Sequence, residues 1–351
     1  MSADVESRQV EPTSGAKQVI KQVILLVVAL VFLWLAFRGT DMPHLWQEVQ
    51  RVDAGWIAAL CAVCVVSHLV RAWRWTILLR PLSDHPIGLW NSFCAVMVGY
   101  AVNIAVPRGG EIARVVSISK TEKLPWIGVL PTLLIDRLLD IAMLVLLLGV
   151  TLVLLPPELR ESMHGLVNAG IVLCAATVIG LGVLPFVGRI MKWAVGHDAL
   201  RERLPDKVRL TVLQLSDEFD RGTSSLRNPV RLPGIALLSV LIWACYFVSF
   251  YFGLLAFGLQ NTIDLSHGLI IFSVGSIAVI VPTPGSLGTY HLAVSQALQK
   301  VSHLEPARAT AFVTVFHAVT FVLVVCVVAA ICFLIQQAAR KDSPDGQNTD
   351  R

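Results

Sequence analysis

The chain has 351 residues, of which 55% are hydrophobic and 15% are charged, and its formal net charge is +4. Soluble domains carry about 25% charged residues, so this composition excludes an ordinary soluble protein and indicates a polytopic helical membrane protein. The sequence lacks the alternating ten-residue pattern of an outer-membrane barrel. Its basic residues flank apolar runs, which does not suggest nucleic-acid binding.

Six apolar runs approach or exceed the length of about 20 residues that a membrane span requires. In chain order they cover residues 20–37, 55–79, 125–155, 166–188, 233–259 and 308–336. Residues 1–18 are predicted to be a disordered tail, and residues 337–351 a second polar tail. The first run ends at Phe37 and Arg38 without a small-residue cleavage site, so it is expected to be an uncleaved span.

Two further apolar runs, 89–106 and 266–281, are short and end at breaks rich in proline and glycine. Proline removes a backbone donor and glycine permits backbone shapes closed to other residues. Such backbone survives at membrane depth only inside protein or along a wet cavity. The sequence therefore predicts re-entrant helical hairpins over 89–120 and 266–303. The turns are expected at Asn103, Pro107, Gly109, Gly110, Pro282, Pro284, Gly285 and Gly288.

The same order of elements occurs twice: span, span, hairpin, span. The first membrane half is predicted over 19–155, and the second over 156–188 and 233–336. Three spans per half would insert the halves in opposite senses, which predicts an inverted-topology repeat, a plan typical of transporters. The predicted fold class is thus an all-α polytopic membrane protein with about six full spans plus two re-entrant hairpins.

Basic residues indicate the orientation. Arg71, Arg74 and Arg80 stand with tryptophans at the end of the span 55–79, a combination typical of a cytoplasmic headgroup boundary. The segment 189–232 is predicted to be cytoplasmic and amphipathic, lying on the membrane surface or docked on the bundle. Its nine cations are Arg189, Lys192, Arg201, Arg203, Lys207, Arg209, Arg221, Arg227 and Arg231. Both termini are then cytoplasmic.

Arg108, Glu111 and Arg114 follow the first break at steps of three residues, so a helix would place them on one face. One interpretation is an internal salt bridge that ties the hairpin to its neighbours. The other is a site for an anionic headgroup, because the planar guanidinium group matches phosphate and a helix N-terminus offers free N–H groups to it.

A second charged group lies in the first half of the span 125–155. Asp136 and Asp140 are four residues apart and share a helix face, with Arg137 beside them. Arg137 could neutralise one carboxylate and so reduce the cost of burial. The group is interpreted either as a structural pair near the first hairpin or as the acidic end of a substrate or proton path.

His291 follows the second break, and its imidazole could donate to phosphate or serve only in packing and hydrogen bonding. Cys61 and Cys64 have CxxC spacing, but without a second pair they are expected to be small core residues. No catalytic residue, metal site or cofactor is predicted. The candidate substrate-binding residues are Arg108, Glu111, Arg114, Asp136, Arg137, Asp140 and His291.

Three segments in this order, Asn103–Arg114, Asp136–Asp140 and Pro282–Gly288, resemble the lysylphosphatidylglycerol synthase transmembrane region. This is the flippase-like family of the multiple peptide resistance factor, and the resemblance covers roughly residues 20–336. Asp136 stands where the family has glutamate, and His291 where a glutamate follows the second turn. The resemblance implies lipid translocation. No segment resembles the soluble aminoacyl-transferring domain, so synthesis of a lysyl-lipid by this chain alone is not expected.

The sequence thus favours a flippase-like protein of the bacterial inner membrane that moves an anionic or modified phospholipid, or a polyprenyl-phosphate-linked lipid, between leaflets. The alternative is a membrane-embedded enzyme or an accessory subunit in the synthesis of lipids or lipid-linked glycans. The expected partner is the membrane lipid itself. A lipid-synthesis enzyme and a second copy of the chain stay open as protein partners.

Overall fold

The computed structural model of the protein describes residues 27, 30–106, 109–154, 164–197, 205–281 and 283–341, and every regular element in these ranges is helical. Several parts of the predicted organisation lie outside the described residues. These are the tail 1–18, the start of the span 20–37, the turn 156–163, residues 342–351 of the second tail, and the break residues Pro107, Arg108 and Pro282.

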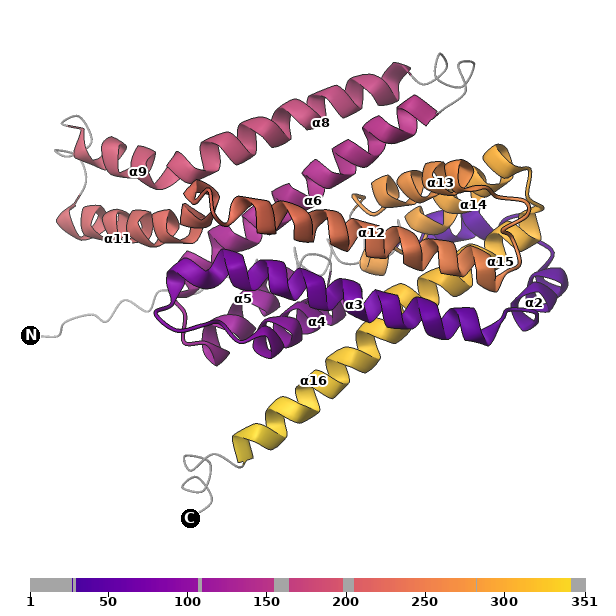
Figure 1. Ribbon diagram of the computed structural model, residues 1–351, viewed down its shortest axis with the longest axis horizontal. Coiled ribbons are helices and arrows are strands. Elements are labelled where there is room, and N and C mark those ends of the chain that lie inside the picture. The colour runs from indigo at the N-terminus through magenta and orange to yellow at the C-terminus, as the bar shows by residue number, and fades with distance from the viewer. Residues whose placement is uncertain are drawn as a thin grey trace, which may run out of the picture.

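The described helices run through the chain in two comparable series (Figure 1). The first is α2 (Met42–Gln50), α3 (Ala54–Leu79), η1 (Arg80–Leu82), α4 (Leu89–Ala105), α5 (Gly109–Thr121) and α6 (Trp126–Leu154). Then come α8 (His164–Val183), η2 (Leu184–Phe186), α9 (Val187–Gly196), α11 (Asp206–Thr223) and η3 (Ser224–Arg227). The last are α12 (Leu232–Ala256), α13 (Leu265–Ala278), η4 (Pro284–Ser286), α14 (Thr289–Ser302), α15 (Pro306–His317), η5 (Ala318–Leu323) and α16 (Val324–Lys341).

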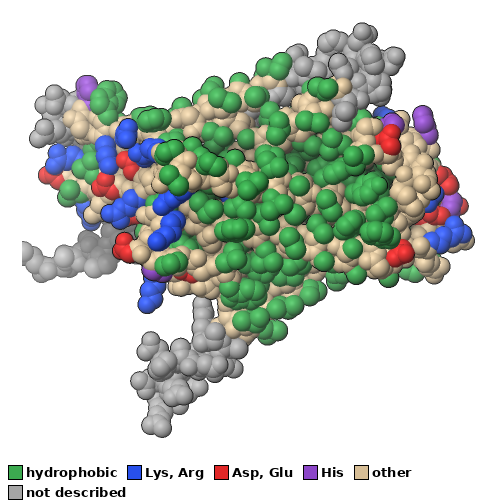
Figure 2. All heavy atoms as spheres, viewed as in Figure 1, with side chains coloured by type: hydrophobic (Ala, Val, Ile, Leu, Met, Phe, Trp, Pro, Cys, Tyr) green, Lys and Arg blue, Asp and Glu red, His purple; other side chains and the backbone are tan. Residues whose placement is uncertain are grey.

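Membrane-spanning length is present in both series. Among the described residues, the segments Ala54–Leu82, Cys174–Gly196, Leu232–Ala256 and Pro306–Gln337 are long and apolar enough to cross a bilayer. Helix α6 fills the predicted span 125–155 but carries three charged side chains in its first half. Figure 2 shows apolar side chains over the middle of the visible face and charged ones at its two ends, as expected for a membrane protein.

Helices α4 and α5 form the first helical hairpin. The carboxylate of Glu122, just after α5, accepts the N–H of Gly88 at 3.1 Å, so the hairpin starts and ends on the same side of the protein. The helices cross where a Cβ on Gly110 would overlap the carbonyl oxygen of Gly99. Gly110 was expected to serve a turn, but it lies inside the first turn of α5, and its role is this close approach.

Helices α13 and α14 form the second hairpin, and its turn does need glycine. Gly285 has φ +56 and Gly288 has φ +80, and Pro284 opens the short helix η4 between them. A Cβ on Gly285 would lie 3.8 Å from the side chain of Ile104, near the end of α4. The tips of the two hairpins therefore meet.

The two hairpins extend from opposite ends of the protein. The outer end of the second packs in one hydrophobic cluster with α2, because Leu45, Ile263 and Leu304 are buried together. The outer end of the first lies by the C-terminal end of α3, where Leu79 and Ile87 share another cluster. In Figure 1 helices α3 and α12 pass side by side between these ends.

The basic segment predicted over 189–232 folds as α9, α11 and η3. Helix α11 docks on α6, where Gly222 approaches the carbonyl oxygen of Gly128. It is also joined to α9, since Lys192 lies 2.6 Å from Asp217. Of the two arrangements expected for this amphipathic helix, docking on the bundle is the one observed.

The last long helix changes its winding halfway. Helix α15 packs in the cluster at the α2 end, with Phe312 and Phe316 buried. Helix α16 packs against α4 in the other cluster, with Val325 and Cys332 buried. Between them, η5 is a π-helical stretch.

Candidate functional site

Two arginines of α3 hold two aspartates of α6 in the interior. Arg71 Nη1 lies 3.1 Å from Asp136 and 2.7 Å from Asp140. Arg74 Nη2 lies 2.7 Å from a carboxylate oxygen of each aspartate. The spacing explains the match, because residues three or four apart on a helix share a face. The side chains of Arg74 and Asp136 are fully buried.

Helix α12 completes the coordination of these arginines. The hydroxyl of Tyr246 accepts from Nε and Nη2 of Arg71 at 3.2 and 3.1 Å. The hydroxyl of Ser239 accepts from Nη1 of Arg74 at 2.9 Å. Buried guanidinium groups are tolerated when their donors are satisfied in this way.

Helix α5 of the first hairpin adds a third arginine. Arg114 Nη1 lies 2.9 Å from Asp136, and its guanidinium stacks 3.8 Å above the ring of Trp75. The Nε and Nη2 atoms of Arg114 are buried and have no hydrogen-bond partner among the described residues. A buried donor without an acceptor is costly, so Arg114 has capacity for another anion.

A more exposed ion pair lies next to this cluster. Arg137 Nε is 3.2 Å from Glu111 Oε1, and about a third of each side chain or more is exposed. The sequence suggested that Arg137 neutralises a neighbouring aspartate, but that role falls to Arg71 and Arg74. Arg137 instead ties α6 to the start of α5.

The cluster as a whole is cationic. Four guanidinium groups, those of Arg71, Arg74, Arg114 and Arg137, face three carboxylates, those of Glu111, Asp136 and Asp140, which leaves one positive charge. A net buried charge is unfavourable in the absence of a counter-ion. The arrangement therefore suits a single anionic group better than a metal, and the described residues contain no group of three or more metal-ligating side chains.

The interpretation of Arg71 and Arg74 as a headgroup boundary was wrong, because both are buried in this cluster. Trp75 is buried with them, whereas Trp73 is exposed. Sequence reasoning missed both arginines, Tyr246 and Ser239 as parts of the site. The available signal was the three-residue step between two arginines on a face whose other members are apolar.

His291 lies apart from these charges. Its ring packs 4.7 Å from that of His317, whose Nε2 bonds the carbonyl oxygen of Gly285 at 2.8 Å. Among the described residues, no hydrogen bond or ion pair joins His291 to the arginine–aspartate cluster. The two histidines instead connect the turn of the second hairpin to the last span. Asn103 plays the expected part in the first turn, since its Oδ1 accepts from Gly110 N at 2.9 Å.

Comparisons with known proteins point to one family. The family described as the lysylphosphatidylglycerol synthase TM region matches residues 22–327. A curated relative, the glycosyltransferase AglD of Haloferax volcanii, is 25% identical over 332 residues, which cover 86% of this chain and 52% of the relative. The chain thus spans about half the length of that relative. No solved structure matches.

Proposed function

Because the chain belongs to the family of the lysylphosphatidylglycerol synthase transmembrane region, we propose that it is a flippase-like protein. It moves an anionic or modified phospholipid, or a polyprenyl-phosphate-linked lipid, between leaflets. The observation that carries this proposal is the buried guanidinium of Arg114, whose Nε and Nη2 lack acceptors in a cluster with excess positive charge. Phosphate fits such donors well, and a lipid phosphate reaches the membrane interior only when its headgroup crosses.

The two hairpins support a route for the headgroup. They extend from opposite ends and their tips meet, which in a membrane corresponds to two re-entrant hairpins within an inverted repeat. In this proposal Arg108 and Arg114 hold the phosphate, while Glu111 and Arg137 line its approach. Asp136 and Asp140 fix the arginines of α3, and His291 supports the second tip.

A leaflet assay on the reconstituted protein tests this function. Vesicles carry lipids with a fluorescent label, and dithionite quenches the outer leaflet. Arg114→Gln is expected to slow headgroup movement at least tenfold. Arg221→Gln is the matched control, because it removes the same charge from an exposed side chain of α11. Equal rates for Arg114→Gln and wild type across several headgroups would overturn the proposal.

The relative named as a glycosyltransferase favours a second candidate function. In this alternative the chain is an enzyme or an accessory subunit in the synthesis of lipid-linked glycans. Both buried aspartates are engaged by arginines, which speaks against their use as general bases. Incubation with polyprenyl-phosphate-linked sugars would reveal a product if the chain is an enzyme. A stoichiometric co-purifying partner, with no transport by the chain alone, would favour the accessory role.

The proposed topology places both termini and the α9–α11 segment in the cytoplasm of a bacterial inner membrane. Single cysteines at Lys207 and Asp264, in a chain without other cysteines, test it with a membrane-impermeant maleimide. On intact cells the Asp264 position should react and the Lys207 position should not. The reverse pattern would show that the protein is inserted the other way.

A further inference from the structure

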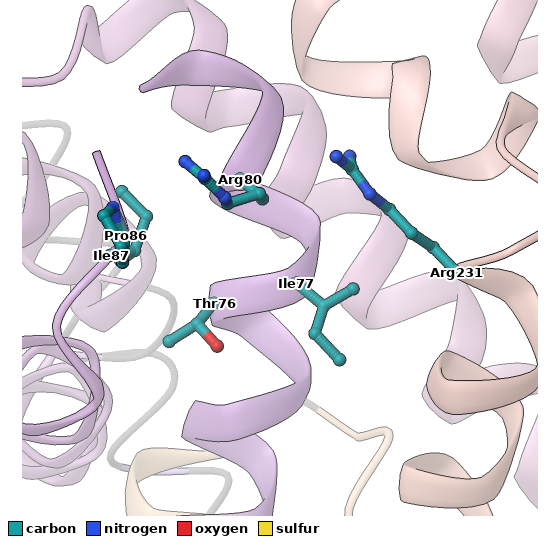
Figure 3. Close-up of a pocket in the computed structure, with 6 residues that line it drawn as sticks. All are labelled: Thr76, Ile77, Arg80, Pro86, Ile87 and Arg231. Atoms are coloured by element: carbon teal, nitrogen blue, oxygen red, sulfur yellow. The ribbon is translucent and has the colours of Figure 1, made fainter. Parts of the chain in front are cut away.

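A groove lies at the basic end of the protein, where α3 ends and α12 begins. Its volume is about 290 Å³. Figure 3 shows Arg80 on α3 and Arg231 at the start of α12, with Thr76 and Ile77 on α3 between Arg231 and the segment before α4. Pro86 and Ile87 of that segment line the other side. No residue of the buried arginine–aspartate cluster is among these six.

Neutral oxygens position the two arginines of this groove. Arg80 Nη1 donates to the carbonyl oxygens of Ser83 and His85 at 3.1 and 2.9 Å. Arg231 Nη1 lies 3.5 Å from the hydroxyl of Ser225. Neither arginine forms an ion pair in the described part of the chain. Each guanidinium therefore keeps its full charge at the groove.

Other basic side chains at this end are compensated. Arg227 lies 3.0 Å and Lys192 3.3 Å from carboxylate oxygens of Asp220. The carboxylate of Glu122, just after α5, accepts from Asn91 Nδ2 at 2.7 Å and is engaged there. The absence of carboxylates around Arg80 and Arg231 is thus local to the groove.

The groove continues into an apolar surface along α3. Trp73, Ile77 and Arg80 are separated by four and three residues, so they follow one another on one face. Trp73 is 53% exposed. Tryptophan typically lies at the headgroup level of a membrane. An aromatic ring, an aliphatic side chain and a cation in this order match a phospholipid from its acyl chain to its phosphate.

We propose that this groove binds the headgroup of an anionic phospholipid. Arg80 and Arg231 donate to the phosphate oxygens, and the upper acyl chain lies along Ile77 and Trp73. Guanidinium groups suit phosphate because their donors are planar and always charged. The site is separate from the buried cluster and does not depend on transport. The apolar wall assigns the phosphate to a lipid rather than to a free ion.

Native mass spectrometry of the full chain, purified in detergent, tests the site with phosphatidylglycerol and phosphatidylcholine as probes. The double variant Arg80→Gln/Arg231→Gln is expected to bind phosphatidylglycerol at least tenfold more weakly, with binding of phosphatidylcholine unchanged. The control Arg221→Gln should bind both lipids as the wild type does. Equal binding of phosphatidylglycerol by the double variant and the wild type would overturn the proposal.

Three further measurements keep the result clear. Trp73→Ala leaves every charge in place and should still weaken phosphatidylglycerol binding, so it replaces the double variant if that variant does not fold. Glycerol phosphate in 100-fold excess should not displace the lipid, and displacement would mean a site for free phosphate. Arg114→Gln should keep this binding while losing transport, so the two proposals can fail separately.

Discussion

Asp136→Asn is expected to destabilise the protein strongly. The substitution keeps the shape of the side chain and removes its charge. Asp136 is fully buried and lies within 2.7 to 3.1 Å of Arg71, Arg74 and Arg114. With an amide there, Asp140 is the remaining carboxylate that contacts the arginines of α3. The interior then holds more uncompensated charge than before.

The magnitude follows from the burial of the pair. Removing one partner of a buried ion pair costs about 3–5 kcal/mol, because the remaining charges stay in a medium of low dielectric constant. Glu111→Gln provides the matched control, because it removes one carboxylate from a pair that is about a third exposed on both sides. Exposed pairs contribute about 0–1 kcal/mol.

Thermal unfolding in detergent, followed with a thiol-reactive dye, measures the difference. Cys64, Cys94 and Cys332 are buried and become reactive only on unfolding, while Cys174 and Cys326 are exposed and give the baseline. At roughly 2 °C per kcal/mol, Asp136→Asn should lower the Tm by about 6–10 °C. Glu111→Gln should lower it by about 2 °C or less.

A double variant tests the electrostatic reason directly. Arg114→Gln removes the guanidinium with unpaired donors, so Arg114→Gln/Asp136→Asn should be more stable than Asp136→Asn alone. The coupling between contacting residues is about 0.5–3 kcal/mol. If Asp136→Asn and Glu111→Gln have the same Tm, or if the double variant is the less stable one, the cluster does not stabilise the fold as described.

Two other predictions concern the hairpins. Gly110→Ala should lower the Tm, because its Cβ meets backbone and overpacking costs about 1–3 kcal/mol. Gly149→Ala, whose Cβ meets open space inside α6, should leave the Tm unchanged or raise it, and equal losses would refute the crossing geometry. Asp264 accepts the backbone N–H of His267, which lowers its pKa to about 2 from the usual 3.8. Its cap on α13 therefore stabilises fully above about pH 4 and is lost as the pH falls through 2, whereas Asp264→Asn should show no such loss in Tm.

The positions of the two hairpins could be predicted because their signals are local. A short apolar run followed by proline and glycine is visible within a few residues, and the predicted range 89–120 compares with helices over 89–121. The packing of Gly110 on Gly99 was not predictable in this way. A glycine pair that lets two helices touch looks like a glycine pair that makes a turn.

The interior arginines were missed for a similar reason. Arginine beside tryptophan at the end of an apolar run is the ordinary pattern of a membrane boundary. The contacts that bury Arg71 and Arg74 join them to residues more than 60 positions away in the chain. Spacing alone indicates that two charges share a face, but it does not show which helix will cover that face. The face of Asp136 and Asp140 was predicted, and its partners were not.

The π-helical stretch Ala318–Leu323 lets one span serve two cores. A π-helical turn accommodates one extra residue, and each residue advances a helix by about 100°, so the apolar face of α16 points in a different direction from that of α15. That rotation allows Phe312 to pack at the α2 end while Cys332 packs beside α4. Removing one residue from the stretch would bring both faces into register with a single core. The last span thus acts as a splice between the two halves, and its phase must be kept for both hairpins to stay packed.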